Sequence, residues 1–228
     1  LGGETQGDGA SFSGRILQVF ALITVLSVAP GLLVVTTSFT RFVIVFSMLR
    51  LALGLNQTPP NMVLNAMALF MTFFVMQPVF DDAWQGGLRP LLENSLTEEQ
   101  ALREIATPFQ EFMFANTRPK DLVLFQQFAD LDGPITPIAT PEDAGWRVLV
   151  PAFMISELRR AFTIGFLMYL PFIAIDLIVA SVLMSAGMMM LPPVIVSLPF
   201  KVIFFVLIDG WYLLAGSLMQ SYSAFSGG

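Results

Sequence analysis

Two long apolar blocks, separated by one polar block, make up the pattern of this chain. The first apolar block, residues 15–80, contains an uncharged run of 25 residues between Arg15 and Arg41 and another of 30 residues between Arg50 and Asp81. Each run exceeds the roughly 20 residues that a helix needs to cross a hydrocarbon layer. The second apolar block, residues 148–228, consists of two apolar stretches on either side of a Pro-Pro pair, and the last of them is expected to be one helix with a kink at Pro199. The pattern therefore predicts an all-α protein built from two membrane-associated helical hairpins.

Prolines and glycines divide the first block into helices. Pro30-Gly31 interrupts it once, and the segment GLNQTPP, residues 54–60, interrupts it again. Because proline lacks a backbone N–H and disfavours helix continuation, the expected helices cover about 15–29, 32–54 and 61–79. The first two could form one kinked helix, and GLNQTPP is then the turn of a helical hairpin.

The polar block, residues 81–147, has the signals of a soluble helical insertion. Thr97 and Gln100 have capping-box spacing at the start of one amphipathic helix, and Pro119 stands in the first turn of another. A proline-rich stretch over residues 132–145 predicts a loop. The block holds 12 of the 17 acidic residues but 5 of the 11 basic ones, whereas cytoplasmic loops are usually rich in Lys and Arg. We therefore expect an extracytoplasmic, periplasmic insertion.

The composition points away from catalysis. Hydrophobic residues make up 55% of the chain and charged residues 12%, which is typical of a membrane-associated helical protein. The chain has no cysteine and no histidine, so it lacks thiolate ligands and the commonest general base and metal ligand. We expect no enzymatic activity, no metal site, no cofactor and no nucleic-acid partner.

The first residues form a separate polar segment. Residues 1–14, LGGETQGDGASFSG, are rich in glycine and nearly free of apolar side chains. A disordered mature N-terminus that remains after signal-peptide removal has this composition, and so does a segment added for expression. We predict disorder for these residues in either case.

Three ionisable residues interrupt the last apolar stretches: Asp176, Lys201 and Asp209. A charge at the centre of a bilayer costs about 2.5 to 3.5 kcal/mol on the lenient insertion scale, so these groups should face protein or water. Lys201 and Asp209 lie roughly 12 Å apart along one helix and cannot pair within it. They form structural ion pairs that hold a bundle or oligomer together, or they form the proton relay of a small carrier.

The segment SELRRAF carries a second group of charges. Glu157 and Arg160 are three residues apart on one helix face and could pair with each other. Alternatively, Glu157, Arg159 and Arg160 bind a neighbouring subunit, because two arginines and one acid leave positive charge over for an outside partner. The sequence leaves these two interpretations open.

The stretch GMMMLPP places Met188, Met189 and Met190 side by side between Gly187 and the Pro192-Pro193 pair. Consecutive residues on a helix fan over about 200° and cannot all face one pore, which favours simple core or lipid-facing packing. Glycine and proline, however, predict a turn here, where the same three side chains could share one constriction.

Several of these stretches resemble one family. PAFMISELRRAFTIGF (151–166) and LPFKVIFFVLIDGW (198–211) are similar to the two signature stretches of the FliP family of flagellar export-gate proteins, which is related to the SctR family of virulence secretion systems. Residues 37–80 resemble the family's first hairpin, and GMMMLPP resembles its methionine loop. Thr163 departs from the family, which usually has a charged or amide residue there, and so does Leu51, where a polar residue is frequent.

The resemblance implies a non-enzymatic role in the bacterial inner membrane, at the flagellar basal body. About five copies would assemble with FliQ-like and FliR-like proteins into a helical ring that forms the entrance of the export channel. Unfolded flagellar export substrates would pass through it, served by gate proteins of the FlhA and FlhB type. The family's hairpins are raised largely out of the bilayer plane, with much of the chain on the periplasmic side.

The resemblance also implies roles for single residues. Met188, Met189 and Met190 would form a channel gasket, with Gly187, Pro192 and Pro193 as its hinge. Phe112 and Phe125 would help to plug the outer end, although packing between two amphipathic helices explains these rings equally simply. The expected subunit-interface charges are Glu157, Arg159, Arg160, Asp176, Lys201 and Asp209.

Overall fold

The structure is a computed structural model of the 228-residue chain. It describes residues 19–20, 23–24, 27, 31–55, 57–129, 138–188 and 190–223, and all the regular secondary structure in these ranges is helical. This confirms the predicted all-α class. The predicted disordered terminus, residues 1–14, and most of the predicted helix 15–29 lie outside the described residues.

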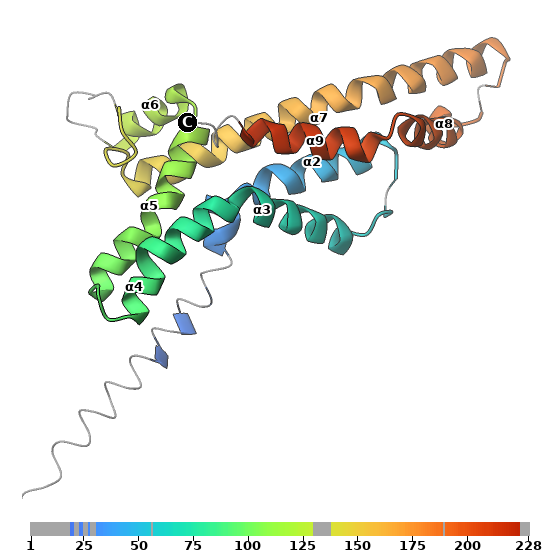
Figure 1. Cartoon of the computed structure of the whole chain (residues 1–228). Coiled ribbons are helices and arrows are strands. Elements are labelled where there is room, and N and C mark those ends of the chain that lie inside the picture. Colours follow the sequence, from blue (N-terminus) through green and yellow to red (C-terminus); the bar gives the residue numbers. More distant parts are fainter. Residues whose placement is uncertain are drawn as a thin grey trace, which may run out of the picture.

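Figure 1 shows an elongated molecule in which the apolar helices lie along one another and the polar helices gather at one end. Residues 31–36 are helical and precede α2. In chain order, the named helices are α2 (Phe39–Ala52), α3 (Asn61–Ala83), the π-helical turn η1 (Trp84–Leu88), α4 (Arg89–Leu92), α5 (Glu98–Asn116), α6 (Pro119–Ala129), α7 (Trp146–Ser185), α8 (Pro193–Leu207) and α9 (Gly210–Ser223).

The helices α2 and α3 contact each other as a hairpin, and their ends differ from the expected bounds. The expected helix 32–54 is interrupted at Thr37-Ser38, where α2 begins one residue later. The expected helix 61–79 extends as α3 to Ala83, through Pro78 and two aspartates, so the change to polar composition at residue 81 does not end it. An aspartate side chain exposed to solvent is compatible with continued helix hydrogen bonding.

The capping box at the start of α5 is confirmed. The Thr97 side chain accepts a hydrogen bond from the backbone N–H of Gln100, and the Gln100 side chain accepts one from the backbone N–H of Thr97. These bonds satisfy two of the N–H groups that a helix start leaves without partners. The helix α6 begins at Pro119, as the sequence predicted.

The predicted last helix is corrected. We expected one helix with a kink at Pro199, but Pro199 lies within α8, and the bend comes between α8 and α9, whose axes differ by 62°. Asp209 stands at this bend with φ +51°, in the left-handed region that ends a helix. Gly210 follows, and a Cβ there would stand 2.2 Å from the Phe205 ring, so glycine permits the tight turn.

The core lies where α2 crosses α7. Phe42, Val45 and Phe46 of α2 are buried in the core, and Gly165 of α7 lets α2 and α7 approach closely. A Cβ on Gly165 would stand 2.3 Å from the Met48 sulfur. A position without a side chain therefore sets the spacing between the two hairpins.

The helix α7 is the longest of the named helices and contacts helices of both hairpins. Its 40 residues extend over roughly 60 Å, about twice the thickness of a hydrocarbon layer. Its N-terminal half contacts α2, α5 and α6, whereas its C-terminal half has α8 beside it. By length and composition, two helical stretches, 61–92 and 146–185, could cross a membrane, or three if the bent pair α8–α9 acts as one span.

Candidate functional site

A buried ion pair joins α2 to α7. Arg41 donates from Nε to Glu157 Oε2 at 2.8 Å and from Nη2 to Oε1, and both side chains are 0% exposed. From α9, the Tyr222 hydroxyl donates to Glu157, and the Tyr222 ring lies 3.7 Å from the Arg41 guanidinium carbon. Ser221 Oγ accepts from Arg41 Nη1 at 2.8 Å. The partner of Glu157 is thus Arg41, and the pairing with Arg160 that the i, i+3 spacing suggested does not form.

This cluster connects three helices that are far apart in the sequence. Removing two charges from water is costly, and the cost is offset only when the geometry is good and the remaining hydrogen-bonding groups have partners. The Arg41–Glu157 pair meets these conditions because the contact is bidentate and Tyr222 supplies a third donor to the carboxylate. The cluster therefore holds α2, α7 and α9 in one arrangement.

A second polar network attaches the start of α6 to α7. The Ser156 hydroxyl donates to Asp121 Oδ2 at 2.6 Å, and Arg118 donates to the two oxygens of Asp121 at 2.8 and 2.9 Å. The backbone N–H of Arg118 donates to Ser156 Oγ at 3.1 Å. These bonds fix the start of α6 against α7 at Ser156, the residue next to Glu157.

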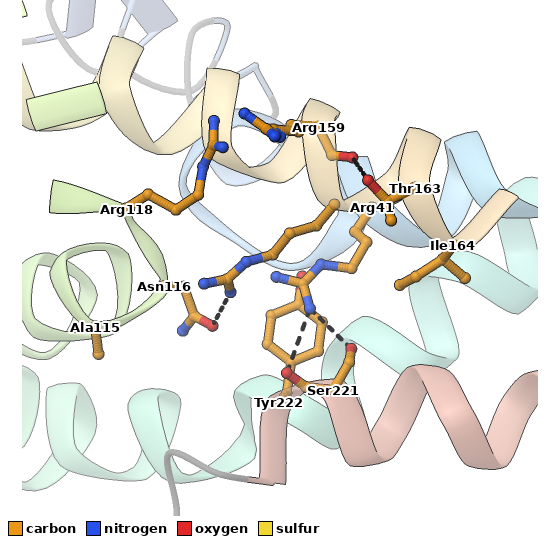
Figure 2. Close-up of a pocket in the computed structure, with 10 residues that line it drawn as sticks. Arg41, Ala115, Asn116, Arg118, Arg159, Thr163, Ile164, Ser221 and Tyr222 are labelled. Carbon is orange, nitrogen blue, oxygen red and sulfur yellow. Dashed lines mark hydrogen bonds between the residues drawn. The ribbon is translucent and has the colours of Figure 1, made fainter. Parts of the chain in front are cut away.

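An arginine-lined pocket opens beside both networks. It has a volume of about 550 Å³ and lies between α5, α7 and α9. Figure 2 shows Arg41, Arg118 and Arg159, which come from different segments, around this pocket, with Tyr222 at one side. Arg160 also lines it and donates to Asn116 Oδ1 at 3.4 Å. Among the described residues, neither Arg159 nor Arg160 forms an ion pair.

The charges predicted in the last apolar stretches, Asp176, Lys201 and Asp209, are divided between two places. Lys201 of α8 pairs with Asp176 of α7, with 2.6 Å between Nζ and Oδ2, and Lys201 is 3% exposed. Ser197 donates to the other oxygen of Asp176. Lys201 Nζ also lies 3.9 Å from where a Cβ would stand on Gly54, just beyond the C-terminal end of α2, where a helix favours a cation. This pair therefore fastens the second hairpin near the turn of the first.

Asp209 lies apart from that pair. It is exposed at the bend between α8 and α9, and in the part of the chain that the structure describes it forms no ion pair. Glu157, Asp176 and Lys201 thus have partners within the chain. Arg159, Arg160 and Asp209 are the predicted interface charges that remain available to another molecule.

The methionine loop forms the tip of the hairpin between α7 and α8. Gly187 has φ +70°, a conformation that glycine adopts without steric cost, and the Met188 N–H donates back to Leu183 O at 2.9 Å. Met188 is 47% exposed and Met190 is 99% exposed. Met189 lies outside the described residues. Pro192 and Pro193 follow the loop, and Pro193 opens α8 in the first-turn position that proline favours.

The two predicted plug residues differ in exposure. Phe112 is 1% exposed and packs against Phe153 and Tyr222, with ring centroids 6.0 and 5.9 Å apart. Phe125 of α6 is partly buried at the edge of the core. Phe112 is therefore part of the packing between α5, α7 and α9 in this conformation, and a plugging role for the two rings stays a prediction.

A model of the FliP family matches residues 22–218. This chain belongs to the FliP family. Among its relatives, the flagellar biosynthetic protein FliP of Agrobacterium fabrum is 58% identical over 96% of this chain and 89% of the relative. The protein of the same name from Rhizobium meliloti is 56% identical over 93% of this chain and 86% of the relative. The one from Bacillus subtilis is 50% identical over 90% of this chain and 91% of the relative.

Sequence reasoning missed several residues that this FliP-family chain uses in its polar networks. Arg41 was noted only as the end of an uncharged run, yet it is the partner of Glu157. Tyr222, Ser221 and Ser197 gave no signal, because single hydroxyl groups in apolar stretches are common. The usable signal for Arg41 was its position between two apolar runs, since a charge there requires a partner.

Proposed function

We propose that this chain is a core subunit of the flagellar type III protein-export gate in the bacterial inner membrane. About five copies assemble with FliQ-like and FliR-like proteins into the entrance of a channel for unfolded flagellar substrates, served by FlhA- and FlhB-type gate proteins. The observation that carries the proposal is the 58% identity over 96% of this chain to a relative named flagellar biosynthetic protein FliP.

The apolar surface of the chain supports assembly. A monomeric soluble protein rarely exposes a contiguous apolar patch beyond a few hundred Å². Here several large side chains on each apolar helix are more than half exposed: Met62, Phe70 and Phe74 on α3, Ile178 and Val182 on α7, Val206 and Leu207 near the end of α8, and Tyr212 on α9. Such faces require lipid or other subunits to cover them.

The exposure of the methionine loop supports a gasket. Met188 and Met190 project from the tip of the α7–α8 hairpin and have little packing within the chain. Methionine is apolar, so a ring of such side chains resists wetting, and its flexible thioether adapts to unlike partners. Five loops around one axis would seal an idle channel and still fit different export substrates.

We expect the gasket to fail when its side chains are shortened. Replacing Met188, Met189 and Met190 together by alanine removes their volume from the hairpin tip, away from the buried ion pairs, so the complex should assemble in normal yield. The inner membrane should then leak small ions, measured as conductance of the purified complex in planar bilayers. Replacing three exposed apolar residues of the polar helices (Leu92, Leu102 and Phe128) by alanine provides a control of comparable volume loss. Unchanged conductance at normal complex yield would exclude the gasket.

We expect Asp209 to contribute its charge to an interface between subunits. Asp209→Asn removes the charge but keeps a residue that tolerates the left-handed backbone at φ +51°. The thermal unfolding of the single chain should stay unchanged, whereas native mass spectrometry should recover fewer complete oligomers. Glu111→Gln, at an exposed position of α5, is the matched control. Complete oligomers in normal amount from the Asp209→Asn chain would exclude this role.

The carrier alternative makes an opposite prediction. A proton-coupled carrier that uses Asp176, Lys201 and Asp209 would take up substrate when the purified chain alone is reconstituted in vesicles. An export-gate subunit should show no uptake without its partners. Uptake by the single chain would therefore replace the export-gate proposal.

A further inference from the structure

The arginine-lined pocket carries positive charge in excess. Four arginines line it: Arg41, Arg118, Arg159 and Arg160. Glu157 neutralises Arg41 and Asp121 neutralises Arg118, so four cations against two anions leave two positive charges. The remaining charges belong to Arg159 and Arg160, which stand next to each other on α7. Guanidinium groups that form no ion pair and line one pocket are well suited to recognise phosphate and carboxylate groups.

An apolar groove continues from this pocket. A second cavity of about 570 Å³ lies between α7 and the α8–α9 pair, and Ile164 and Ser221 line both cavities. The groove wall is formed almost entirely by apolar side chains, among them Leu167, Phe172, Phe204, Phe205, Leu213 and Leu214. The arginine-lined pocket therefore borders an apolar groove, and Ile164 and Ser221 belong to the lining of both.

The arginines stand at one end of an apolar helical segment. From Ala161 to Ser185, α7 contains 25 residues with Asp176 as the single charge. This segment is roughly 37 Å long, enough to cross a hydrocarbon layer of about 30 Å. In a bilayer crossed by this segment, Arg159 and Arg160 would lie at the level of the lipid headgroups. Tyr222 of α9 lines the same pocket.

We propose that the pocket and the groove together bind one anionic phospholipid. Arg159 and Arg160 hold its phosphate group, and an acyl chain lies in the groove between α7 and α9. A carboxylate from a second copy would satisfy the arginines but would leave the adjoining apolar groove empty, whereas a phospholipid fills both. A lipid held in a protein groove brings its headgroup with it, so the site does not require the whole hairpin to lie in the bilayer plane.

The binding can be measured on the full chain in a non-ionic detergent. We expect native mass spectrometry to show an adduct of phosphatidylglycerol, with at least about a tenfold preference over phosphatidylcholine, because net negative lipid charge adds attraction to each arginine. The preference should disappear in the double variant Arg159→Gln with Arg160→Gln. It should persist when Arg89 and Arg103 are replaced by glutamine, since these arginines are exposed and lie on α4 and α5.

A second variant tests the groove without touching the arginines. Leu213 is 55% exposed and lines the groove, so Leu213→Trp should fill it and lower phosphatidylglycerol binding severalfold, with little change in the thermal unfolding of the lipid-free chain. Equal binding of the two lipids by the unaltered chain would overturn the proposal. Glycerol phosphate binding as tightly as the whole lipid would also overturn it, because the groove would then contribute nothing.

The competing role of the arginines at a subunit interface has its own result. If the double arginine variant keeps full phosphatidylglycerol binding but loses oligomers, Arg159 and Arg160 face a neighbouring copy and the lipid site is excluded. Lipid binding is measured on the single chain, and export-gate assembly is measured on the complex. Failure of the lipid site therefore leaves the proposed function standing, and the reverse also holds.

Discussion

We expect the substitution Glu157→Ala to lower the folding stability of the chain so far that most of the protein no longer folds. The substitution leaves the Arg41 guanidinium at 0% exposure without its carboxylate, and the Tyr222 hydroxyl loses its acceptor. Breaking one side of a buried ion pair typically costs about 3 to 5 kcal/mol. Since whole domains are stable by roughly 5 to 15 kcal/mol, this loss brings the chain close to unfolding. Thermal unfolding and protease resistance of the detergent-purified chain measure it.

Two variants calibrate this result. Glu99→Ala breaks an ion pair of the same kind, with Arg103, in which both side chains are 78% exposed, so its effect should stay within about 1 kcal/mol. Tyr222→Phe removes only the hydroxyl donor to Glu157 and should cost about 1.5 to 3 kcal/mol. We expect the order Glu157→Ala, Tyr222→Phe, Glu99→Ala from most to least destabilising. Equal stability of the two glutamate variants would show that the buried cluster does not hold α2 to α7.

The helices of this chain were largely predictable because local chemistry specifies them. The break between α2 and α3 and the capping box at Thr97 depend on neighbours within a few positions. The bend between α8 and α9 was also readable, since Asp209-Gly210 is a typical turn dipeptide. Pro199 attracted the prediction instead, but a proline in the second turn of a helix leaves most of the helix hydrogen bonds intact.

The partners of the buried charges were not predictable in the same way. Glu157 and Arg160 satisfy the i, i+3 rule, yet Glu157 pairs with Arg41, which is 116 residues away in the sequence. Spacing rules compare neighbours on one helix, whereas the choice between partners is decided by which helices cross and which side chains they bury together. The crossing of α2 and α7 depends on Gly165, a position that no charge pattern indicates.

The residue roles in the proposed channel are implied by the family resemblance. The structure adds how exposed each of these side chains is within the single chain. Met188 and Met190 are exposed at a hairpin tip, which a pattern of apolar residues could not show, because the same pattern fits a buried turn. Phe112 shows the opposite case, since its amphipathic helix could present the ring to a channel or to the core, and it packs in the core. The exposed fraction of the side chain thus distinguishes Met188 and Met190 from Phe112, although all three are equally apolar in the sequence.

The pair Asp176–Lys201 should respond unequally to the loss of its two partners. Lys201 is 3% exposed, whereas the Asp176 side chain is 28% exposed and also accepts a hydrogen bond from Ser197. Asp176→Leu leaves a buried ammonium near the end of α2 and should cost about 3 to 5 kcal/mol. Lys201→Met leaves a carboxylate that water and Ser197 still reach, so its cost should be clearly smaller. Thermal unfolding of the single chain and oligomer recovery by native mass spectrometry both follow this order.

The double variant of the same pair decides between a pairwise effect and two separate ones. If the two charges interact directly, Asp176→Leu with Lys201→Met should be more stable than Asp176→Leu alone, because no charge remains buried without a partner. If Lys201 is satisfied chiefly by the carbonyl groups at the C-terminal end of α2, Asp176→Leu should cost little and the double variant should gain nothing over it. If Asp176→Leu lowers stability less than Lys201→Met does, the contact that holds the two hairpins together is the one between Lys201 and the end of α2, close to Gly54. The ion pair with Asp176 would then contribute little.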